Sequence, residues 1–182
     1  MQAEQTIHVM HDVTAYDEAL AAHCFRVFEY VSKMTQTLSV TSEELKMAAL
    51  VHDVGKIFIN KEILNKNGAL TDTERSIVDL HSYFGYCYLR SLSVKPMVCN
   101  LVLFHHGTDK PRMDLIPNPD AELLYLADIL RVCDIYDALT VDRSYHHKME
   151  RTEALSILRR ESVPSVFVDC MEQITKDPGM FP

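Results

Sequence analysis

Seven histidine and aspartate residues of this sequence are placed where their side chains can bind metal ions. Each lies on, or next to, an otherwise apolar stripe of a predicted helix. They are His23, His52, Asp53, His81, His105, His106 and Asp134. Imidazole nitrogen and carboxylate oxygen are suitable ligands for iron, manganese, nickel or zinc. Burying all seven without partners would be costly, whereas a pair of divalent ions can satisfy them together. We therefore predict a centre of two metal ions.

Packing without metal is the competing interpretation. A single inward histidine is more often a hydrogen-bonded core residue than a ligand, and Asp134 lies within helical reach of Arg131. A helical interaction domain whose histidines merely pack is thus a second hypothesis. The remaining histidines are interpreted as plain surface. These are His8, His11, His146 and His147.

Several familiar catalytic motifs are absent. The only Gly-Lys pair, Gly55-Lys56, has Leu50 at the first glycine position of a P-loop pattern and Ile57 after the lysine. The sequence has no GxGxxG and no GxSxG. Nucleotide binding by a P-loop or a dinucleotide fold and serine hydrolysis are therefore not supported.

Composition predicts a globular protein that binds neither nucleic acid nor membranes. The chain has 182 residues, 47% of them hydrophobic, and a net charge of −8, which opposes binding to DNA, RNA or an acidic membrane. No apolar run approaches the roughly 20 residues that span a bilayer, and no signal peptide is evident, so we expect a cytoplasmic protein. The five cysteines form no CxxC pair and are expected to be buried thiols. They are Cys24, Cys87, Cys99, Cys133 and Cys170.

Periodicity predicts the helices that carry these residues. Only five glycines are present, and apolar residues recur at helical spacing, which indicates an all-α protein. A first helix is expected over about 15–38, and Thr41-Ser-Glu-Glu44 resembles a capping box that opens a second helix reaching His52. A second box, Thr71-Asp-Thr-Glu74, opens a helix that includes His81.

The second half of the chain follows the same pattern. A helix ends near Gly107, a proline-containing loop covers 107–120, and a long helix follows over about 121–139. Two shorter helices are expected over 151–161 and 164–175. We predict a single compact domain over 1–182, a bundle of about seven helices.

Three segments together resemble the HD-GYP branch of the HD-domain phosphohydrolases. The first is AALVHDVGKIFINKEILNKNGALTDTERSIVDLH, the second LVLFHHG and the third ILRVCDIYDALTVDRSY. They resemble the family's HD-x-GK segment, its paired-histidine helix and its Asp-x-Tyr-Asp-Ala-Leu-Thr helix. The resemblance covers about residues 20–147 and implies an HD-domain helical bundle.

The resemblance also implies roles for individual residues. Asp53 would bridge two divalent metals, iron or manganese in first place and nickel or zinc as alternatives. His23, His52 and Asp134 would hold one ion, and His81, His105 and His106 the other. Lys56 would touch a phosphate oxygen, and Arg143 would contact the bound nucleotide. Asp53 and Lys56 are thus the candidate catalytic residues.

The implied activity is hydrolysis of a cyclic dinucleotide, most simply cyclic di-GMP to linear pGpG or GMP. Two cations can activate water and neutralise the phosphate, so no protein nucleophile is required. Three positions depart from the family pattern: Gly-Tyr-Pro is missing after His105-His106-Gly107, Ala19 replaces a glutamate found in some members, and His146 replaces a basic residue.

These departures keep two alternatives open. One is hydrolysis of another nucleotide or phosphate ester. The other is a non-catalytic domain that binds a cyclic dinucleotide or a signalling protein partner. Lys110 and Arg112, in the altered loop, are interpreted as plain surface.

Overall fold

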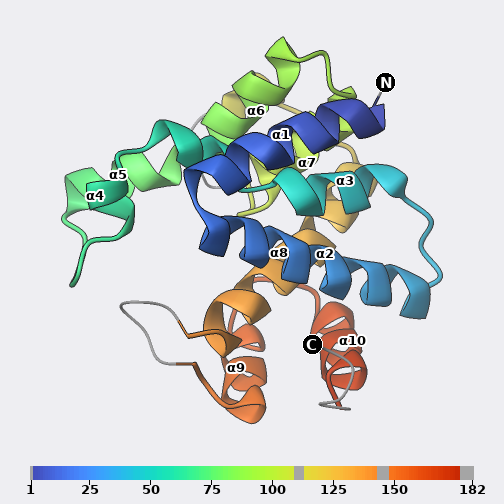
Figure 1. Ribbon diagram of the computed structural model, residues 1–182. Helices are drawn as coiled ribbons and strands as arrows, with labels where there is room; N and C mark the ends of the chain where they lie inside the picture. The colour runs from blue at the N-terminus through green and yellow to red at the C-terminus, as the bar shows by residue number, and fades with distance from the viewer. Residues whose placement is uncertain (1, 109–112, 143–147, 177–182) are drawn as a thin grey trace.

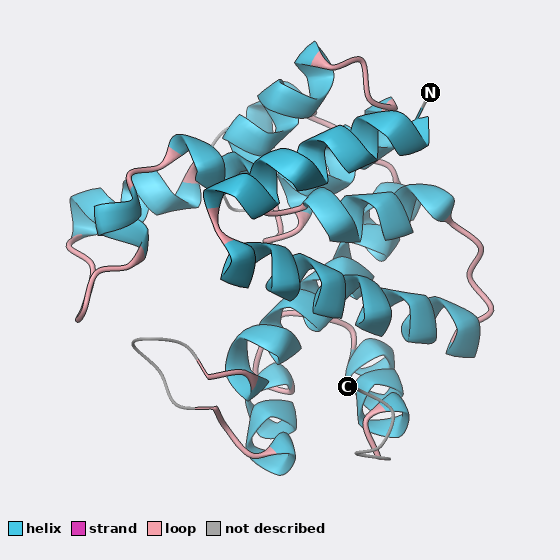
Figure 2. Ribbon diagram, viewed as in Figure 1, coloured by secondary structure: helices cyan, strands magenta, loops and turns pink. Residues whose placement is uncertain are grey.

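The described part of the chain consists of helices joined by loops, without strands (Figures 1 and 2). The computed structural model describes residues 2–108, 113–142 and 148–176. Its helices are α1 (Gln2–Tyr16), α2 (Glu18–Thr37), α3 (Glu43–Val51), η1 (Val54–Phe58), α4 (Lys61–Leu64), α5 (Asp72–Asp79), α6 (His81–Ser91), α7 (Pro96–Phe104), η2 (Met113–Leu115), α8 (Ala121–Thr140), α9 (Arg151–Leu158) and α10 (Ser165–Ile174). The predicted all-α class is confirmed. The described helices outnumber the seven or so expected, because α1, α4 and the two 3₁₀ helices were not predicted and one predicted helix is divided into α5 and α6.

Side-chain caps explain where several helices begin. The Asp17 side chain accepts a hydrogen bond from the Leu20 backbone N–H and starts α2. The predicted capping box at Thr71 is present, since Thr71 and Glu74 each accept from the other's backbone N–H. The box predicted at Thr41 is wrong. Ser42, in extended conformation, is the N-cap of α3, and its side chain accepts from Leu45 N–H.

The core lies between the long helices α2 and α8 and the helices packed on them. Along α8 the side chains of Ile129, Leu130, Val132 and Cys133 are fully buried. Helix α2 packs against α1, α3 and α8, and α7 packs against α3, α6 and α8. In the view of Figure 1, α9 and α10 lie below α2 and α8, on the side away from α1 and α6. This arrangement surrounds the ends of α3 and α7 with other helices.

Gly55 permits the close approach of η1 to the start of α6. A Cβ atom on Gly55 would lie 1.8 Å from the carbonyl oxygen of His81 and 2.5 Å from the backbone nitrogen of Gly85. No side chain fits in that space, so only glycine allows this contact. The contact brings Asp53, two residues before Gly55, next to His81.

The cysteines are confirmed as free thiols, but not all of them are buried. Cys87 is exposed, whereas the other four are buried. The buried face of α6 consists of His81, Ser82, Gly85 and Leu89. Cys87 falls between these positions on the helix and so points outward. None of the helices in the described segments combines the length and the apolar character that crossing a bilayer requires.

Candidate metal centre

The structure brings all seven predicted side chains together from five parts of the chain. His23 lies in α2 and Asp134 in α8, while His52 and Asp53 directly follow α3. His81 is the first residue of α6, and His105 and His106 directly follow α7. Six of the seven are buried, and the side chain of His106 is 28% exposed. Helix ends supply five of these side chains. Adjacent residues along a helix point about 100° apart and cannot both face one site, whereas two adjacent residues at a helix end can do so.

One group consists of His23, His52 and Asp134. The Nε2 atoms of His23 and His52 are 3.3 Å apart. Asp134 Oδ1 lies 3.1 Å from His23 Nε2 and 3.6 Å from His52 Nε2. One potential ligand atom of each residue therefore faces the same point, as in a three-ligand metal site.

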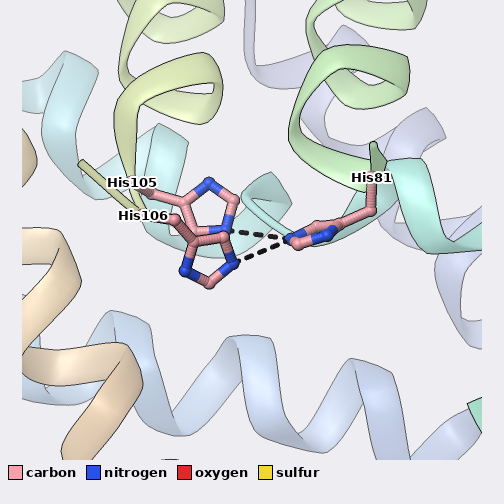
Figure 3. A group of neighbouring side chains, drawn as sticks. All are labelled: His81, His105 and His106. Carbon is pink, nitrogen blue, oxygen red and sulfur yellow. Dashed lines mark hydrogen bonds between the residues drawn. The ribbon is translucent and has the colours of Figure 1, made fainter. Parts of the chain in front are cut away.

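The second group consists of His81, His105 and His106. Figure 3 shows the paired histidines at the end of α7 and His81 at the start of α6 pointing toward one another. His81 Nε2 lies 3.2 Å from His105 Nε2 and 3.0 Å from His106 Nε2. This group also satisfies the geometry of three ligands for one ion.

Asp53 lies between the two groups and presents one oxygen to each. Its Oδ2 atom is 3.4 Å from His23 Nε2 and 3.6 Å from His52 Nε2. Its Oδ1 atom is 3.3 Å from His81 Nε2. Lys56 Nζ donates a hydrogen bond to Oδ2 at 2.5 Å. A carboxylate in this position can bridge two cations.

The tautomers of the histidines indicate that the centre fits metal ions. Nδ1 of His52, His81 and His105 lies 2.9, 2.7 and 2.6 Å from the carbonyl oxygens of Ala49, Val78 and Val102. Since a carbonyl only accepts, each Nδ1 carries the proton, and in a neutral ring Nε2 is left with a lone pair. His81 and His105 then face each other with two buried lone pairs.

A cation bound between the two rings would accept both of these lone pairs and remove their mutual repulsion. Nitrogen ligands lie about 2.0–2.1 Å from zinc, so two of them on one ion are about 3.0–3.4 Å apart at the usual bond angles. The observed Nε2 separations of 3.0–3.3 Å match this spacing. Metal-binding histidines also usually donate their second N–H to a carbonyl or carboxylate. The donor set and its hydrogen bonds therefore fit two divalent ions.

The two groups differ in protonation. Burial, together with the charges of Lys56 and His106, lowers the pKa of His81 to about 3 against the opposing effect of Asp53. Burial also opposes the charged form of His23, but hydrogen bonds with Asp134, Asp137 and Asp53 outweigh it and raise its pKa to about 10. The metal-free His81 group is thus ready to bind a cation at neutral pH, whereas the His23 group must first lose a proton.

The aspartates are held in the charged form. Burial alone would raise the pKa of Asp53, but Lys56 and the neighbouring histidines His52 and His23 lower it well below its usual range. Hydrogen bonds from His23 and His52 lower the pKa of Asp134 in the same way, against its burial. Both carboxylates therefore remain anionic in mildly acidic solution.

Asp137 and Arg26 adjoin the centre and were not predicted. The fully buried Asp137 accepts a hydrogen bond from His23 Nδ1 at 2.6 Å through Oδ2. Arg26 Nε donates to Asp137 Oδ1 at 2.7 Å, and Arg26 Nη2 donates to Oδ2 at 2.9 Å. The spacing of three residues, from His23 to Arg26 and from Asp134 to Asp137, places each pair on one helix face and is the signal that could have found them.

A cavity of about 700 Å³ opens beside the centre. His23 and Lys56 line it, so it gives access to one end of the centre. Its wall carries four cationic side chains and two carboxylates, although the whole chain has a net charge of −8. The cationic residues are Arg26, Lys56, Lys66 and Arg75, and the acidic ones Asp17 and Asp142.

Some predicted residues lie outside the described part of the chain. Arg143, expected to contact a nucleotide, is among them, as are Lys110, Arg112 and the pair His146-His147. His8 and His11, interpreted as surface, have side chains that are 61% and 80% exposed.

Comparison with known proteins identifies relatives along most of the chain. The model of the HD domain family matches residues 20–139, about two thirds of the chain. A 3'3'-cGAMP-specific phosphodiesterase of Vibrio cholerae is 29% identical over 93% of this chain and 38% of its own length. A cyclic di-GMP phosphodiesterase of Pseudomonas aeruginosa is 36% identical over 62% of this chain and 27% of its own length. The chain thus spans well under half of these relatives.

A solved structure has the same fold. The HD domain of the phosphodiesterase PgpH from L. monocytogenes, in complex with cyclic-di-AMP, superimposes with a TM-score of 0.68 at 11% identity. The match covers 91% of this chain and 92% of that one. At this identity the likeness concerns the arrangement of the helices alone.

Proposed function

The chain belongs to the HD domain family, and we propose that it is a metal-dependent phosphodiesterase that hydrolyses a cyclic dinucleotide at a centre of two ions. The observation that carries this proposal is Asp53, whose two oxygens face two separate groups of three potential ligands. Relatives named as cyclic di-GMP and 3'3'-cGAMP phosphodiesterases support the substrate class. Cyclic di-GMP is our first candidate.

The seven side chains would hold iron or manganese, with nickel or zinc as alternatives, because imidazole and carboxylate suit all four. One ion would be held by His23, His52 and Asp134, and the other by His81, His105 and His106. Asp53 would contribute to both. Such a pair of cations supplies an activated water and positive charge for the phosphate oxygens.

The chain's own groups bind and orient the substrate. Lys56 lines the cavity and keeps its ammonium group against the Asp53 carboxylate, where it can also donate to a phosphate oxygen. Cavities of about 300–1,000 Å³ commonly hold small-molecule ligands, so about 700 Å³ suits a substrate of this class. Among the described residues of the wall there is no serine, threonine or cysteine, which supports water as the nucleophile.

Product analysis tests the proposal. Protein loaded with Mn²⁺, or with Fe²⁺ under reducing conditions, is incubated with cyclic di-GMP, 3'3'-cGAMP and cyclic di-AMP, and the products are separated by chromatography. We expect a linear dinucleotide or a mononucleotide from at least one of them, and no product with Asp53→Asn. Absence of product from all three, with two metals bound, would contradict the proposal.

Two observations support the alternatives. The Vibrio relative named as cGAMP-specific favours a substrate other than cyclic di-GMP, and the substrate panel separates these cases. The missing Gly-Tyr-Pro favours a domain that binds a cyclic dinucleotide without cleaving it. Tight binding without turnover by the metal-loaded protein would support that second function.

A further inference from the structure

Arg26 holds Asp137 with one edge of its guanidinium group. Nε and Nη2, the two donors on that edge, bond to the two oxygens of the same carboxylate at 2.7 and 2.9 Å. A guanidinium group is planar and has five N–H donors in a fixed arrangement. With two of them used by Asp137, three remain on Nη1 and on the outer side of Nη2, directed away from Asp137.

The three remaining donors are on Arg26, which lines the cavity, whereas its partner Asp137 does not. Asp137 is fully buried, whereas the Arg26 side chain is 35% exposed and lines the cavity together with His23 and Lys56. The outer edge of Arg26 therefore offers a pair of donors to an anion in the cavity, in the geometry that suits a phosphate group.

The other ion pairs of the cavity wall differ from this one. Lys66 places Nζ 2.6 Å from Glu74, and Lys56 places Nζ 2.5 Å from Asp53. A lysine is a point charge, and an adjacent carboxylate largely neutralises it. Arginine can bind one oxyanion on each of two edges. Arg26 is thus suited to hold a carboxylate of the protein and a phosphate of the ligand at once.

We propose that Arg26 is a substrate-binding residue that grips a phosphate group with its outer edge while its inner edge holds Asp137 against His23. This inference rests on the proposed function for the identity of the substrate, but the anion site itself does not. A cyclic dinucleotide carries two phosphodiesters, so one can lie at the metal centre while Arg26 binds the other. The same arginine would then connect substrate recognition to the orientation of His23.

Two variants separate the two edges of Arg26. Arg26→Lys keeps a positive charge for Asp137 but loses the outer pair of donors. Asp137→Asn leaves the outer edge of Arg26 in place but removes the carboxylate that His23 contacts. The control is Arg159→Lys, because Arg159 also binds two carboxylates, Asp169 and Glu172, but on the surface. Circular dichroism verifies that each variant is folded.

The probes are inorganic phosphate, measured by calorimetry on the metal-free protein, and a phosphorothioate analogue of cyclic di-GMP, measured at saturating Mn²⁺, together with the Kd of Mn²⁺ itself. We expect Arg26→Lys to raise the Kd of both probes about tenfold, the effect of losing a charge-assisted pair of hydrogen bonds, and to change the Kd of Mn²⁺ by less than threefold. Asp137→Asn should do the reverse, weakening Mn²⁺ binding about tenfold while phosphate affinity stays within threefold. The control should match the unmodified protein.

The outcomes distinguish this inference from the proposed function. If Arg26→Lys binds phosphate as tightly as the unmodified protein, or if both variants weaken phosphate and Mn²⁺ alike, Arg26 only holds Asp137 and the inference fails. Failure of the unmodified protein to bind phosphate would also overturn it. If Arg26→Lys weakens only phosphate binding and Asp137→Asn weakens only Mn²⁺ binding, but no cyclic dinucleotide is bound or cleaved, the anion site stands and the proposed function fails.

Discussion

Asp53 Oδ1 lies 3.3 Å from His81 Nε2, although the two residues belong to different elements. Asp53 follows α3, and His81 opens α6. They meet because Gly55 lets η1 contact the backbone of α6 without a side chain between them. The other oxygen of Asp53 faces His23 and His52. One carboxylate is thus divided between the two groups of potential ligands.

Asp53→Asn should remove metal from both groups. Asparagine keeps the shape of the side chain but loses the negative charge and one of the two oxygens. Since changing even the hydrogen-bond partners of ligands costs about 10–100-fold in affinity or activity, loss of this carboxylate should reduce phosphodiesterase activity by more than about 100-fold. Elemental analysis should find fewer than one ion per chain. A variant that retains two ions and normal activity would show that Asp53 does not bridge them.

Single histidine substitutions should remove one metal each. His81→Ala takes a ligand from the group with His105 and His106, and His23→Ala takes one from the group with His52 and Asp134. Each should lower the metal content from two ions per chain to about one. His11→Ala is the matched control, because the His11 side chain is 80% exposed, and it should retain both ions. Equal metal content in all three variants would contradict the assignment.

The metal-free protein should be most stable near pH 6.5. The pKa of His81 is about 3 in the folded chain, against about 6.5 when unfolded. Below pH 6.5 the unfolded state binds a proton that the folded state does not, so stability falls as the pH falls toward 3. His105 and His106, whose pKa values burial also lowers, act in the same direction.

His23 produces the opposite slope. Its pKa of about 10 means that the folded state keeps a proton that the unfolded state loses above about pH 6.5, so stability falls as the pH rises toward 10. Urea unfolding between pH 4.5 and 9 checks both slopes, each about 1.4 kcal/mol per pH unit for each proton. His81→Gln should reduce the slope on the acid side by the contribution of one proton, leaving that of His105 and His106, and should not change the slope on the alkaline side. Stability that keeps rising above pH 8 would contradict the protonation of His23.

Gly55→Ala should disrupt the contact between η1 and α6. Its Cβ atom would lie 1.8 Å from the His81 carbonyl oxygen, so the backbone must move. We expect a loss of more than about 4 kcal/mol in the free energy of unfolding, or no folding, and weaker metal binding. Gly68→Ala is the control, because its φ of +121° is strained for alanine but nothing lies within 4 Å of the added Cβ. It should cost about 1–3 kcal/mol, less than Gly55→Ala. Thermal unfolding of the two variants measures the difference.

The sequence predicted the helices best where a local signal marks them. The Thr71 capping box and the long helix α8 are found within one residue of the expected positions. Thr41 and Ser42 are adjacent, and the hydroxyl of either could cap the start of α3. Only the backbone conformation shows that Ser42 is the N-cap. The break at Leu80 between α5 and α6 follows no proline or glycine. It was missed because the apolar spacing continues across it.

The candidate site was more readily predicted than the groups that support it. His52-Asp53 and His105-His106 stand out because polar pairs follow apolar helices. Asp137 and Arg26 do not stand out in the sequence, because an aspartate or an arginine on a helix is usually a surface residue. Their contact joins residues 111 positions apart, from α2 to α8, which no local pattern reveals. Packing of these two helices decides that His23 meets Asp137.

Anomalous diffraction from crystals grown with Mn²⁺ or Fe²⁺, recorded on both sides of the metal absorption edge, tests the central claim most directly. We predict two peaks per chain, each within about 2.0–2.3 Å of its ligands. One should lie among His23, His52 and Asp134, the other among His81, His105 and His106, with Asp53 in contact with both. A single peak, or two peaks that do not share Asp53, would contradict the account.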